Sequence, residues 1–266
     1  MTYRIDRRRA LAGIGTVGLG TLLTACGGGR TAGPTTSAEV TTSAGTTATV
    51  QPQTGADPAL ADLFDDAASC VVTPEQTEGP YYFDPKVIRS DIREDRPGMR
   101  LRLAVRVREV GDCAPVPNAA VDIWHCDAGG LYSGFESAST GSGGPPGRGG
   151  TGRTDDEIYL RGAQVTNADG IVEFVTVYPG WYRGRTVHIH TKVHLDTSTT
   201  LTTQFYFDEA VSAQVYATEP YSSHAGRDTT NERDGVMRSG GDPPPMLTLS
   251  RDGDGYLGLI TIGVDR

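Results

Sequence analysis

Two histidines one residue apart, His188 and His190, are the side chains of this sequence best suited to binding a metal ion. They lie in the segment VHIHTKVHL at 187–195, whose alternation predicts a β-strand. Alternate side chains of a strand share a face, so both imidazoles would project the same way, with their Cα atoms about 6.5–7 Å apart. That spacing suits two neighbouring ligands on one metal ion. The alternative interpretation is a pair of polar residues on a solvated face.

Two tyrosines lie beside turns that could direct them toward this strand. Tyr182 follows the Pro-Gly turn at 179–180, just upstream of the histidines. Tyr132 stands in a glycine-rich loop after an apolar segment that ends at Trp124. Tyrosine is common in β domains, and any one of the 11 tyrosines could equally be a packing residue.

The order of the motifs along the chain resembles the intradiol ring-cleavage dioxygenases, and most closely their secreted branch. These are non-haem Fe(III) enzymes that open catechols between the two hydroxylated carbons. The resemblance covers roughly residues 70–210. It rests on TEGPYY at 77–82, VDIWH at 121–125, GLYS at 130–133, LRG at 160–162, PGWY at 179–182, RTVHIH at 185–190 and TQFYF at 203–207.

The resemblance implies one Fe(III) ion per chain, held by Tyr132, Tyr182, His188 and His190. Phenolate oxygen and imidazole nitrogen suit this hard cation. In the family, a catecholate chelates the iron and displaces one tyrosinate, which here corresponds to Tyr182. Tyr182 would therefore act in catalysis as well as in metal binding.

Further residues correspond to the rest of the family's active site. Arg185, three residues before the first histidine, would stabilise the negative charge that develops on the ring. Gln204 is expected near the substrate. Glu78 and Tyr81 would either line the substrate pocket or pack its entrance.

The implied activity is insertion of both atoms of O2 into a small aromatic diol to give a muconate-type product. Catechol, protocatechuate, hydroxyquinol and lignin-derived catechols all fit the core chemistry. One alternative is a cell-surface β-sandwich that binds ferric iron or a catecholate without turnover. Another is a zinc hydrolase that uses His188, His190 and a carboxylate. The sequence, however, places no carboxylate at a spacing from the histidines that would make it a third ligand.

The elements that must position these residues are mainly strands. Alternating or apolar segments predict strands at 100–108, 118–124, 171–178, 187–195, 203–207 and 256–264. Helical periodicity is confined to 57–68. The 35 glycines and 16 prolines suit a turn-rich β protein. We therefore expect an all-β fold, a single β-sandwich with long functional loops at 136–153 and 218–245.

The first 56 residues predict an exported protein. Residues 1–25 combine a cluster of arginines, including the twin-arginine pattern of the Tat pathway, with an apolar stretch, as in a signal peptide. The sequence LTAC at 23–26 resembles a lipobox, with Cys26 as the lipidated residue. Residues 26–56 are rich in Gly, Ser, Thr and Pro and predict a flexible tether to a domain at 57–266. The expected location is the cell surface, and the alternative is secretion after a plain signal peptide.

Charge and cysteine content indicate which binding partners and which disulfide to expect. The formal net charge is -9, and no basic run follows the N-terminus, which argues against nucleic-acid binding. Membrane contact is expected only through the lipid anchor, and the oligomeric state is not set by the sequence. Cys70 and Cys113 are expected to form a disulfide and to leave Cys126 as a free thiol.

Overall fold

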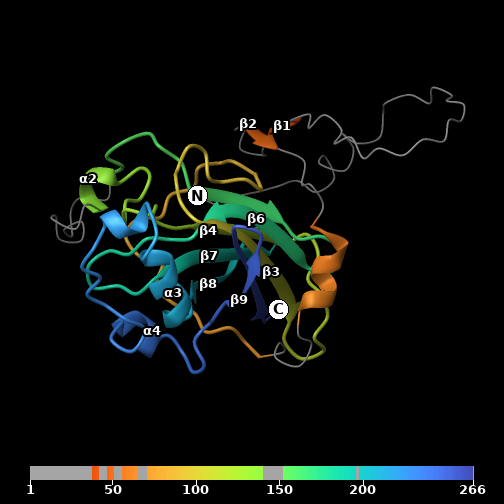
Figure 1. Cartoon of the computed structure of the whole chain (residues 1–266). Helices are drawn as coiled ribbons and strands as arrows, with labels where there is room; N and C mark the ends of the chain where they lie inside the picture. Colours follow the sequence, from red (N-terminus) through yellow and green to blue (C-terminus); the bar gives the residue numbers. More distant parts are fainter. Residues whose placement is uncertain are drawn as a thin grey trace, which may run out of the picture.

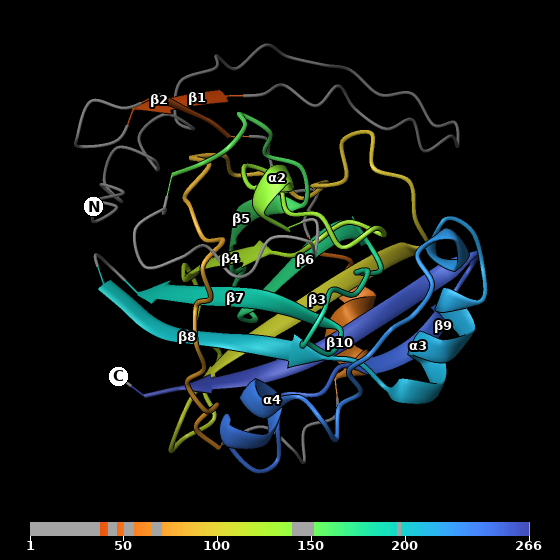
Figure 2. The same cartoon turned by 90° about the vertical axis from the view of Figure 1, so that its left-hand side faces the viewer.

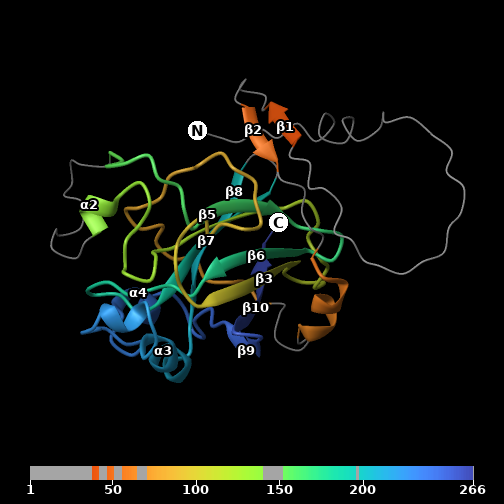
Figure 3. The same cartoon turned by 45° about the horizontal axis from the view of Figure 1, so that its top comes forward.

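Two four-stranded sheets form the body of the protein in the computed structural model (Figure 1). Their strand orders are β6-β3-β10-β9 and β5-β4-β7-β8. The structure describes residues 38–41, 47–50, 56–64, 71–139, 152–195 and 198–265. The sheets lie as two layers, and the helices α2, α3 and α4 gather at one end of them (Figure 3).

The first sheet contains both parallel and antiparallel pairs. Its strands are β3 (Arg100–Glu109), β6 (Ile171–Val177), β9 (Thr248–Asp252) and β10 (Gly255–Val264). β3 is antiparallel to β6 and parallel to β10, and β10 is antiparallel to β9. The strand predicted at 100–108 is thus antiparallel to one neighbour and parallel to the other.

The second sheet is antiparallel throughout and carries the histidine strand near its middle. Its strands are β4 (Ala120–Trp124), β5 (Arg161–Val165), β7 (His188–Leu195) and β8 (Ser198–Tyr206). β7 pairs with β4 on one side and with β8 on the other. The register sets Trp124 and Gln204 directly opposite His190 on the two neighbouring strands.

The hydrophobic core lies between the two sheets. Leu101, Leu103, Val105 and Val107 of β3 are fully buried, as the alternation predicts. They belong to one apolar cluster with Ile189 of β7. Period-two alternation therefore leaves the other face of β7 for His188 and His190.

The outer face of β3 is more buried than its sequence suggests. Ala104 and Arg106 are buried, although alternation assigns them to a solvated face. The 3-10 helix η1 (Pro58–Leu63), capped by the Asp57 carboxylate, covers this face with an apolar cluster that includes Phe64. The Arg106 guanidinium lies over the Phe64 ring, 4.7 Å from its centroid. The helix predicted over 57–68 is thus a shorter 3-10 helix, and residues 65–70 lie outside the described part.

Several elements were not predicted from the sequence. β5 and β9 are short strands. The helices α3 (Glu209–Tyr216), η3 (Tyr221–Ser223) and α4 (Gly235–Ser239) follow β8, so the expected loop at 218–245 contains helical turns. The expected loop at 136–153 begins with α2 (Glu136–Ser139), and residues 140–151 lie outside the described part.

The N-terminal region is described only in part. β1 (Ala38–Thr41) and β2 (Thr47–Val50) pair as an antiparallel two-stranded sheet within the segment predicted to be a tether. The predicted signal peptide at 1–25, with the lipidation residue Cys26, lies outside the described residues. None of the helices in the described ranges is long and apolar enough to cross a membrane.

Only one cysteine of the disulfide lies in the described part of the chain. Cys113 is disulfide-bonded. Cys126 is a free, buried cysteine whose thiol donates to the Gly180 carbonyl at 3.5 Å. Cys70 lies outside the described residues, so its pairing with Cys113 stays a prediction.

An extended segment before β3 crosses the histidine-bearing face of the second sheet. The Gln76 backbone N–H donates to the Thr202 carbonyl at 2.8 Å, and the Gln204 amide donates to the Thr77 carbonyl at 2.8 Å. Figure 2 shows this segment crossing β7 and β8. It brings Gly79 so close to His190 that a Cβ at position 79 would lie 3.1 Å from the His190 Cε1 atom.

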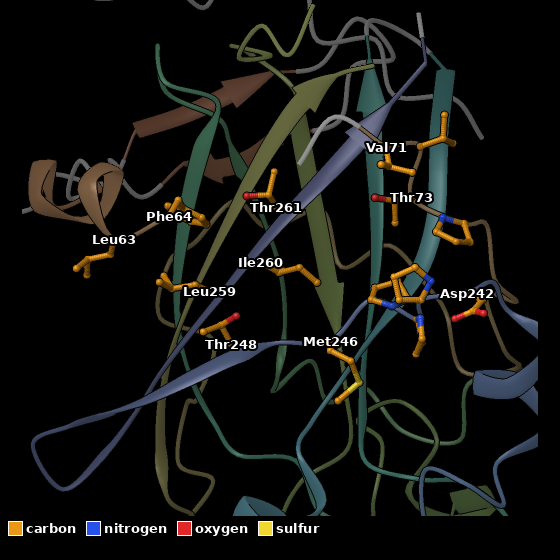
Figure 4. Close-up of a pocket in the computed structure, with 15 residues that line it drawn as sticks. Leu63, Phe64, Val71, Thr73, Asp242, Met246, Thr248, Leu259, Ile260 and Thr261 are labelled. Carbon is orange, nitrogen blue, oxygen red and sulfur yellow. The ribbon is translucent and has the colours of Figure 1, made fainter. Parts of the chain in front are cut away.

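An apolar pocket of about 320 Å³ opens on the outer side of the first sheet (Figure 4). The exposed side chains of Leu63, Val72 and Met246 contribute to its lining, together with those of Leu259 and Ile260. Its lining includes none of the residues that the sequence motifs single out. The pocket and the histidine-bearing face are therefore separate features of the surface.

Asp122 on β4 should make folding stability depend on pH. Its carboxylate is buried and accepts a hydrogen bond from the Tyr82 hydroxyl at 3.0 Å, and burial raises its pKa to about 7. The folded protein therefore keeps a proton that the unfolded chain releases above about pH 4. The contribution of this proton to the unfolding free energy is complete below pH 4 and is lost as the pH rises through 7.

We expect Asp122→Asn to remove this pH dependence. Between pH 4.5 and 8, the unfolding free energy of the wild type should fall relative to the variant by about 3 kcal/mol, since one pKa unit is worth about 1.4 kcal/mol. Denaturant unfolding of both proteins across this range is the measurement. A constant difference between the two curves would show that Asp122 does not titrate there.

Candidate metal centre

Four side chains from separate segments converge on one atom, the Nε2 of His188. The hydroxyl oxygens of Tyr182 and Tyr132 lie 3.1 and 3.4 Å from it. The Nε2 of His190 lies 3.1 Å away. The Nη1 of Arg185 lies 3.5 Å away. The two tyrosines and two histidines predicted as ligands are thus together in the structure, and Arg185 lies beside them.

The fold explains how the tyrosines reach the histidine strand. Tyr132 lies in the loop after β4, and Tyr182 lies in the turn between β6 and β7. The two loops pack closely, because the Gly180 N–H donates to the Asp127 carbonyl at 3.0 Å. A Cβ at Gly180 would clash with that carbonyl oxygen, so only glycine allows this approach.

The tautomer of His188 is set by the backbone. Its Nδ1 lies 2.6 Å from the Thr186 carbonyl oxygen, which can only accept a hydrogen bond. Nδ1 therefore carries the proton, and Nε2 presents a lone pair to the tyrosines. A carbonyl partner on the remote nitrogen is the usual support of a metal-binding histidine.

The crowding around His188 Nε2 suits a cation better than it suits hydrogen bonding alone. One lone pair cannot satisfy two hydroxyls, a guanidinium and a second imidazole at the same time. For ligand bonds of about 2.0–2.1 Å, neighbouring donor atoms of a metal centre lie about 3 Å apart, close to the separations seen here. Two phenols and two imidazoles are donors suited to a hard trivalent ion such as Fe(III).

Burial keeps the four donors neutral in the absence of a cation. Burial raises the pKa of both tyrosines, while the positive charge of Arg185 opposes the rise. Burial lowers the pKa of His188 and His190, and Arg185 adds to the effect. A bound cation would reverse the tyrosine shifts, because it stabilises phenolate. Two phenolates would then balance most of the charge of a trivalent ion.

His190 is oriented by an aromatic ring. Its imidazole stacks parallel on the Trp124 indole, with ring centroids 4.9 Å apart and an interplanar angle of 5°. Within the described part of the chain, its Nδ1 is buried without a hydrogen-bond partner. Packing against Trp124 therefore fixes the plane of the His190 ring, whereas the Thr186 carbonyl fixes both the orientation and the tautomer of His188.

We expect Trp124→Leu to weaken iron retention about 10-fold, and Trp124→Phe to weaken it less, because phenylalanine keeps a flat ring against His190. The measurement is competition for iron with a soluble chelator. Trp181→Leu serves as the control, since Trp181 stacks on His224 rather than on a predicted ligand. Equal iron retention by the two Trp124 variants would contradict this role of the stack.

Arg185 is held by two other side chains. Its Nε donates to the Asp234 carboxylate at 2.9 Å, and its Nη2 donates to the Gln204 side-chain oxygen at 2.5 Å. Gln204, predicted near the substrate, thus lies beside the cluster. Asp234 was not predicted. An aspartate before a short helix is a recognisable N-cap, but nothing in the sequence links it to an arginine 49 residues away.

The two residues predicted at the pocket or its entrance lie in different places. Tyr81 is buried beside the cluster, with its ring 4.9 Å from that of Tyr132 and its hydroxyl donating to the Ala138 carbonyl. Glu78 is partly exposed and pairs with Lys192 of β7. This places Glu78 at the rim of the site.

The remaining histidines have structural contacts. His125 is fully buried, with Nδ1 2.8 Å from the Cys126 carbonyl oxygen and Nε2 2.7 Å from the Thr176 hydroxyl, which agrees with a structural role. His224 is partly exposed. Its Nε2 donates to the Trp181 carbonyl at 3.1 Å, and its ring packs on the indole of Trp181.

The alternative zinc site finds no support in the described residues. Among them, no group of three or more His, Cys, Asp or Glu side chains is arranged to hold a metal ion. The donors gathered at His188 include two tyrosines instead.

Comparison with a family model places the site within a known family. The model described as "Dioxygenase" (Dioxygenase_C) matches residues 77–220, more than half of the chain. The matched region contains all four donors of the cluster and Arg185. Asp234 lies beyond it.

Solved structures of dioxygenases are also similar to this chain. A solved structure titled "Intradiol ring-cleavage Dioxygenase from Tetranychus urticae" is 33% identical, with a TM-score of 0.68, and the match covers 74% of this chain and 95% of that one. The dioxygenase domain of a carbohydrate-binding fusion protein from Streptomyces sp. SirexAA-E is 28% identical, with a TM-score of 0.52, over 73% of this chain and 99% of that one.

A curated relative is the chlorocatechol 1,2-dioxygenase of Rhodococcus opacus. It is 28% identical over 160 residues, which is 53% of this chain and 56% of the relative. The chain spans about half the length of the curated relatives it matches.

Proposed function

Since the chain belongs to the intradiol ring-cleavage dioxygenase family, of enzyme class EC 1.13.11, we propose that it inserts both atoms of O2 into a catechol-type ring. The product is a muconate-type diacid. The family uses non-haem Fe(III). The observation that carries the proposal is the convergence of Tyr132, Tyr182 and His190 on the Nε2 of His188.

Ferric iron, one ion per chain, would be held by these four residues. Bound there, it would act as a Lewis acid that polarises the diol and makes the ring reactive toward O2. Tyr132 and the two histidines are buried, whereas Tyr182 is partly exposed. Tyr182 is therefore the donor best placed to yield its position to an incoming diol and to take up a proton as it does so.

Arg185 supplies a fixed positive charge next to the reacting ring. Its Nη1 points into the cluster, and its other nitrogens are held by protein acceptors, so the guanidinium needs no reorganisation during the reaction. Negative charge that develops on the substrate would be stabilised there. Gln204 and Tyr81 would contact the substrate, and Glu78 would act at the pocket entrance.

The test is an aerobic product assay on protein whose iron content has been measured. The panel contains catechol, protocatechuate, hydroxyquinol and a lignin-derived catechol, with O2 uptake and the ultraviolet absorption of the product as readouts. With ¹⁸O2, both labelled atoms should appear in the diacid. Iron-loaded protein that binds catechols but opens none of them would support the alternative of a ferric iron or catecholate-binding protein without turnover.

We further propose that the protein is an exported lipoprotein of the secreted branch. The support is in the sequence: twin arginines at 7–9, an apolar stretch, and LTAC at 23–26 followed by a Gly/Ser/Thr-rich segment. Cys26 would carry the lipid, and the domain would contact the membrane only through it. Mass spectrometry of membrane-fraction protein should find acyl chains on Cys26, and Cys26→Ser should release the protein. Unmodified protein in the medium would favour plain secretion.

A further inference from the structure

A buried carboxylate on the far side of Arg185 has no part in the chemistry described so far. Asp234 is fully buried and precedes α4. One of its oxygens, Oδ2, accepts from the Arg185 Nε at 2.9 Å and from the Thr186 backbone N–H at 2.7 Å. The other, Oδ1, accepts from the backbone N–H groups of Val236 and Met237 at 2.8 and 2.9 Å.

The two oxygens therefore have separate tasks. Oδ1 caps a helix, and Oδ2 fixes an arginine. Each oxygen accepts two N–H groups, and only an ionised carboxylate offers acceptors on both sides. An asparagine could keep the cap with its oxygen, but its NH2 group would then face the N–H groups of Arg185 and Thr186.

A series of polar contacts runs from Arg185 to the other end of α4. The Arg185 Nη2 donates to Gln204, whose side-chain oxygen lies 3.3 Å from the Tyr206 hydroxyl oxygen. The single proton of that hydroxyl goes to the nearer acceptor, Gln76. That hydroxyl lies 2.6 Å from the Gln76 side-chain oxygen, and the Gln76 amide donates to the Gly240 carbonyl at 3.0 Å. Since Gly240 is the C-cap of α4, the helix is tied to Arg185 from both of its ends.

We propose that Asp234 is a positioning residue. It aims the Arg185 guanidinium at the four candidate metal donors, Tyr132, Tyr182, His188 and His190. The inference rests on the proposed function, because the importance of that aim comes from ring cleavage. Arg185 has five N–H donors on a flexible stem, and a single bond to Gln204 would leave it free to rotate about that contact. The ionised Asp234 removes this freedom and leaves Nη1 directed at the cluster.

The experiment compares Asp234→Asn with Asp208→Asn. Asp208 caps α3 in the same manner, accepting from the backbone N–H groups of Ala210 and Val211, but no arginine of the cluster is bound to it in the described structure. We expect Asp234→Asn to lower kcat about 10- to 100-fold with little change in KM, iron content or visible absorption. Asp208→Asn should leave all four unchanged.

A double-mutant cycle separates positioning from mere stability. In the Arg185→Gln background, Asp234→Asn should cost no further activity, because the residue it positions is gone. If the two losses multiply, Asp234 does not act through Arg185 and the proposal fails. Full activity of the Asp234→Asn protein would overturn it as directly.

A spectroscopic measurement keeps the inference testable if the wild type opens no ring. In full-length protein loaded with diamagnetic Ga(III), the ¹⁵N resonance of Arg185 Nε should show slow proton exchange, which Asp234→Asn makes fast. Wild type that lacks ring cleavage but shows this protection would defeat the proposed function and leave the positioning contact intact. Fast exchange in the wild type would defeat the positioning itself.

Discussion

If the proposed function is correct, we expect His188→Ala to abolish iron binding, the visible colour and all ring cleavage. His188 Nε2 lies within 3.4 Å of the other three candidate donor atoms, so its loss removes the donor that neighbours all of the others. Iron affinity should fall by at least about 100-fold, beyond the usual cost of removing a residue that only supports a ligand. Elemental analysis and the phenolate-to-iron absorption band measure the loss.

His194→Ala is the matched control. His194 lies on the same strand as His188, but it is not among the groups that surround the Nε2 atom. The His194→Ala protein should retain its iron and colour. A coloured, iron-loaded His188→Ala protein would mean that the iron is held elsewhere in the protein.

We expect Arg185→Gln to retain iron and to lower kcat about 100- to 1000-fold, the usual cost of removing one preorganised group that stabilises developing charge. Glutamine can still bond to neighbouring residues but carries no charge. The measurement is steady-state turnover beside iron content and visible absorption. Since Arg185 lies at the edge of the cluster and is not a donor to the metal, the absorption band should persist.

Arg183→Gln supplies the comparison for this variant. Arg183 is two residues away, highly exposed and only loosely paired with Asp228 at 3.9 Å. Its replacement changes the net charge of the chain by the same amount. Turnover should be unaffected in Arg183→Gln, and an equal loss in both variants would show that general charge, rather than the position of Arg185, is responsible.

The sequence predicts the strands that hold the site with good accuracy. β3, β4, β6, β7 and β10 lie within two residues of the predicted segments, whereas β8 begins five residues before its predicted segment at 203–207. The reason is that each alternates or is apolar throughout, and the buried face of each lies against one core. The alternation also predicts which face of β7 each side chain occupies, because Ile189 faces the core and His188 and His190 face the other way.

The elements that the sequence did not predict are defined by long-range contacts. β5, Arg161–Val165, contains Gly162 and polar residues, and its neighbour β4 supplies the pairing. The outer face of β3 is covered by a helix from residues 58–63, which the strand's own alternation cannot reveal.

The same limit applies inside the site. The resemblance of the motifs to a known family singles out the four candidate donors and Arg185, and the structure brings these five side chains together. The groups that hold these side chains in place are less visible: a backbone carbonyl at Thr186, the flat face of Trp124, and Asp234. Each becomes meaningful only when the fold brings it beside its partner.

The parallel pairing of β10 with β3 has a consequence for how the protein is made. β3 lies between β6 and β10, and β10 is synthesised about 150 residues after β3. Until then one edge of β3 has unpaired backbone groups and an incomplete apolar face, which invites association with other chains. This edge of β3 is therefore paired only after β10 has been synthesised, so the first sheet is the last part of the fold to be completed.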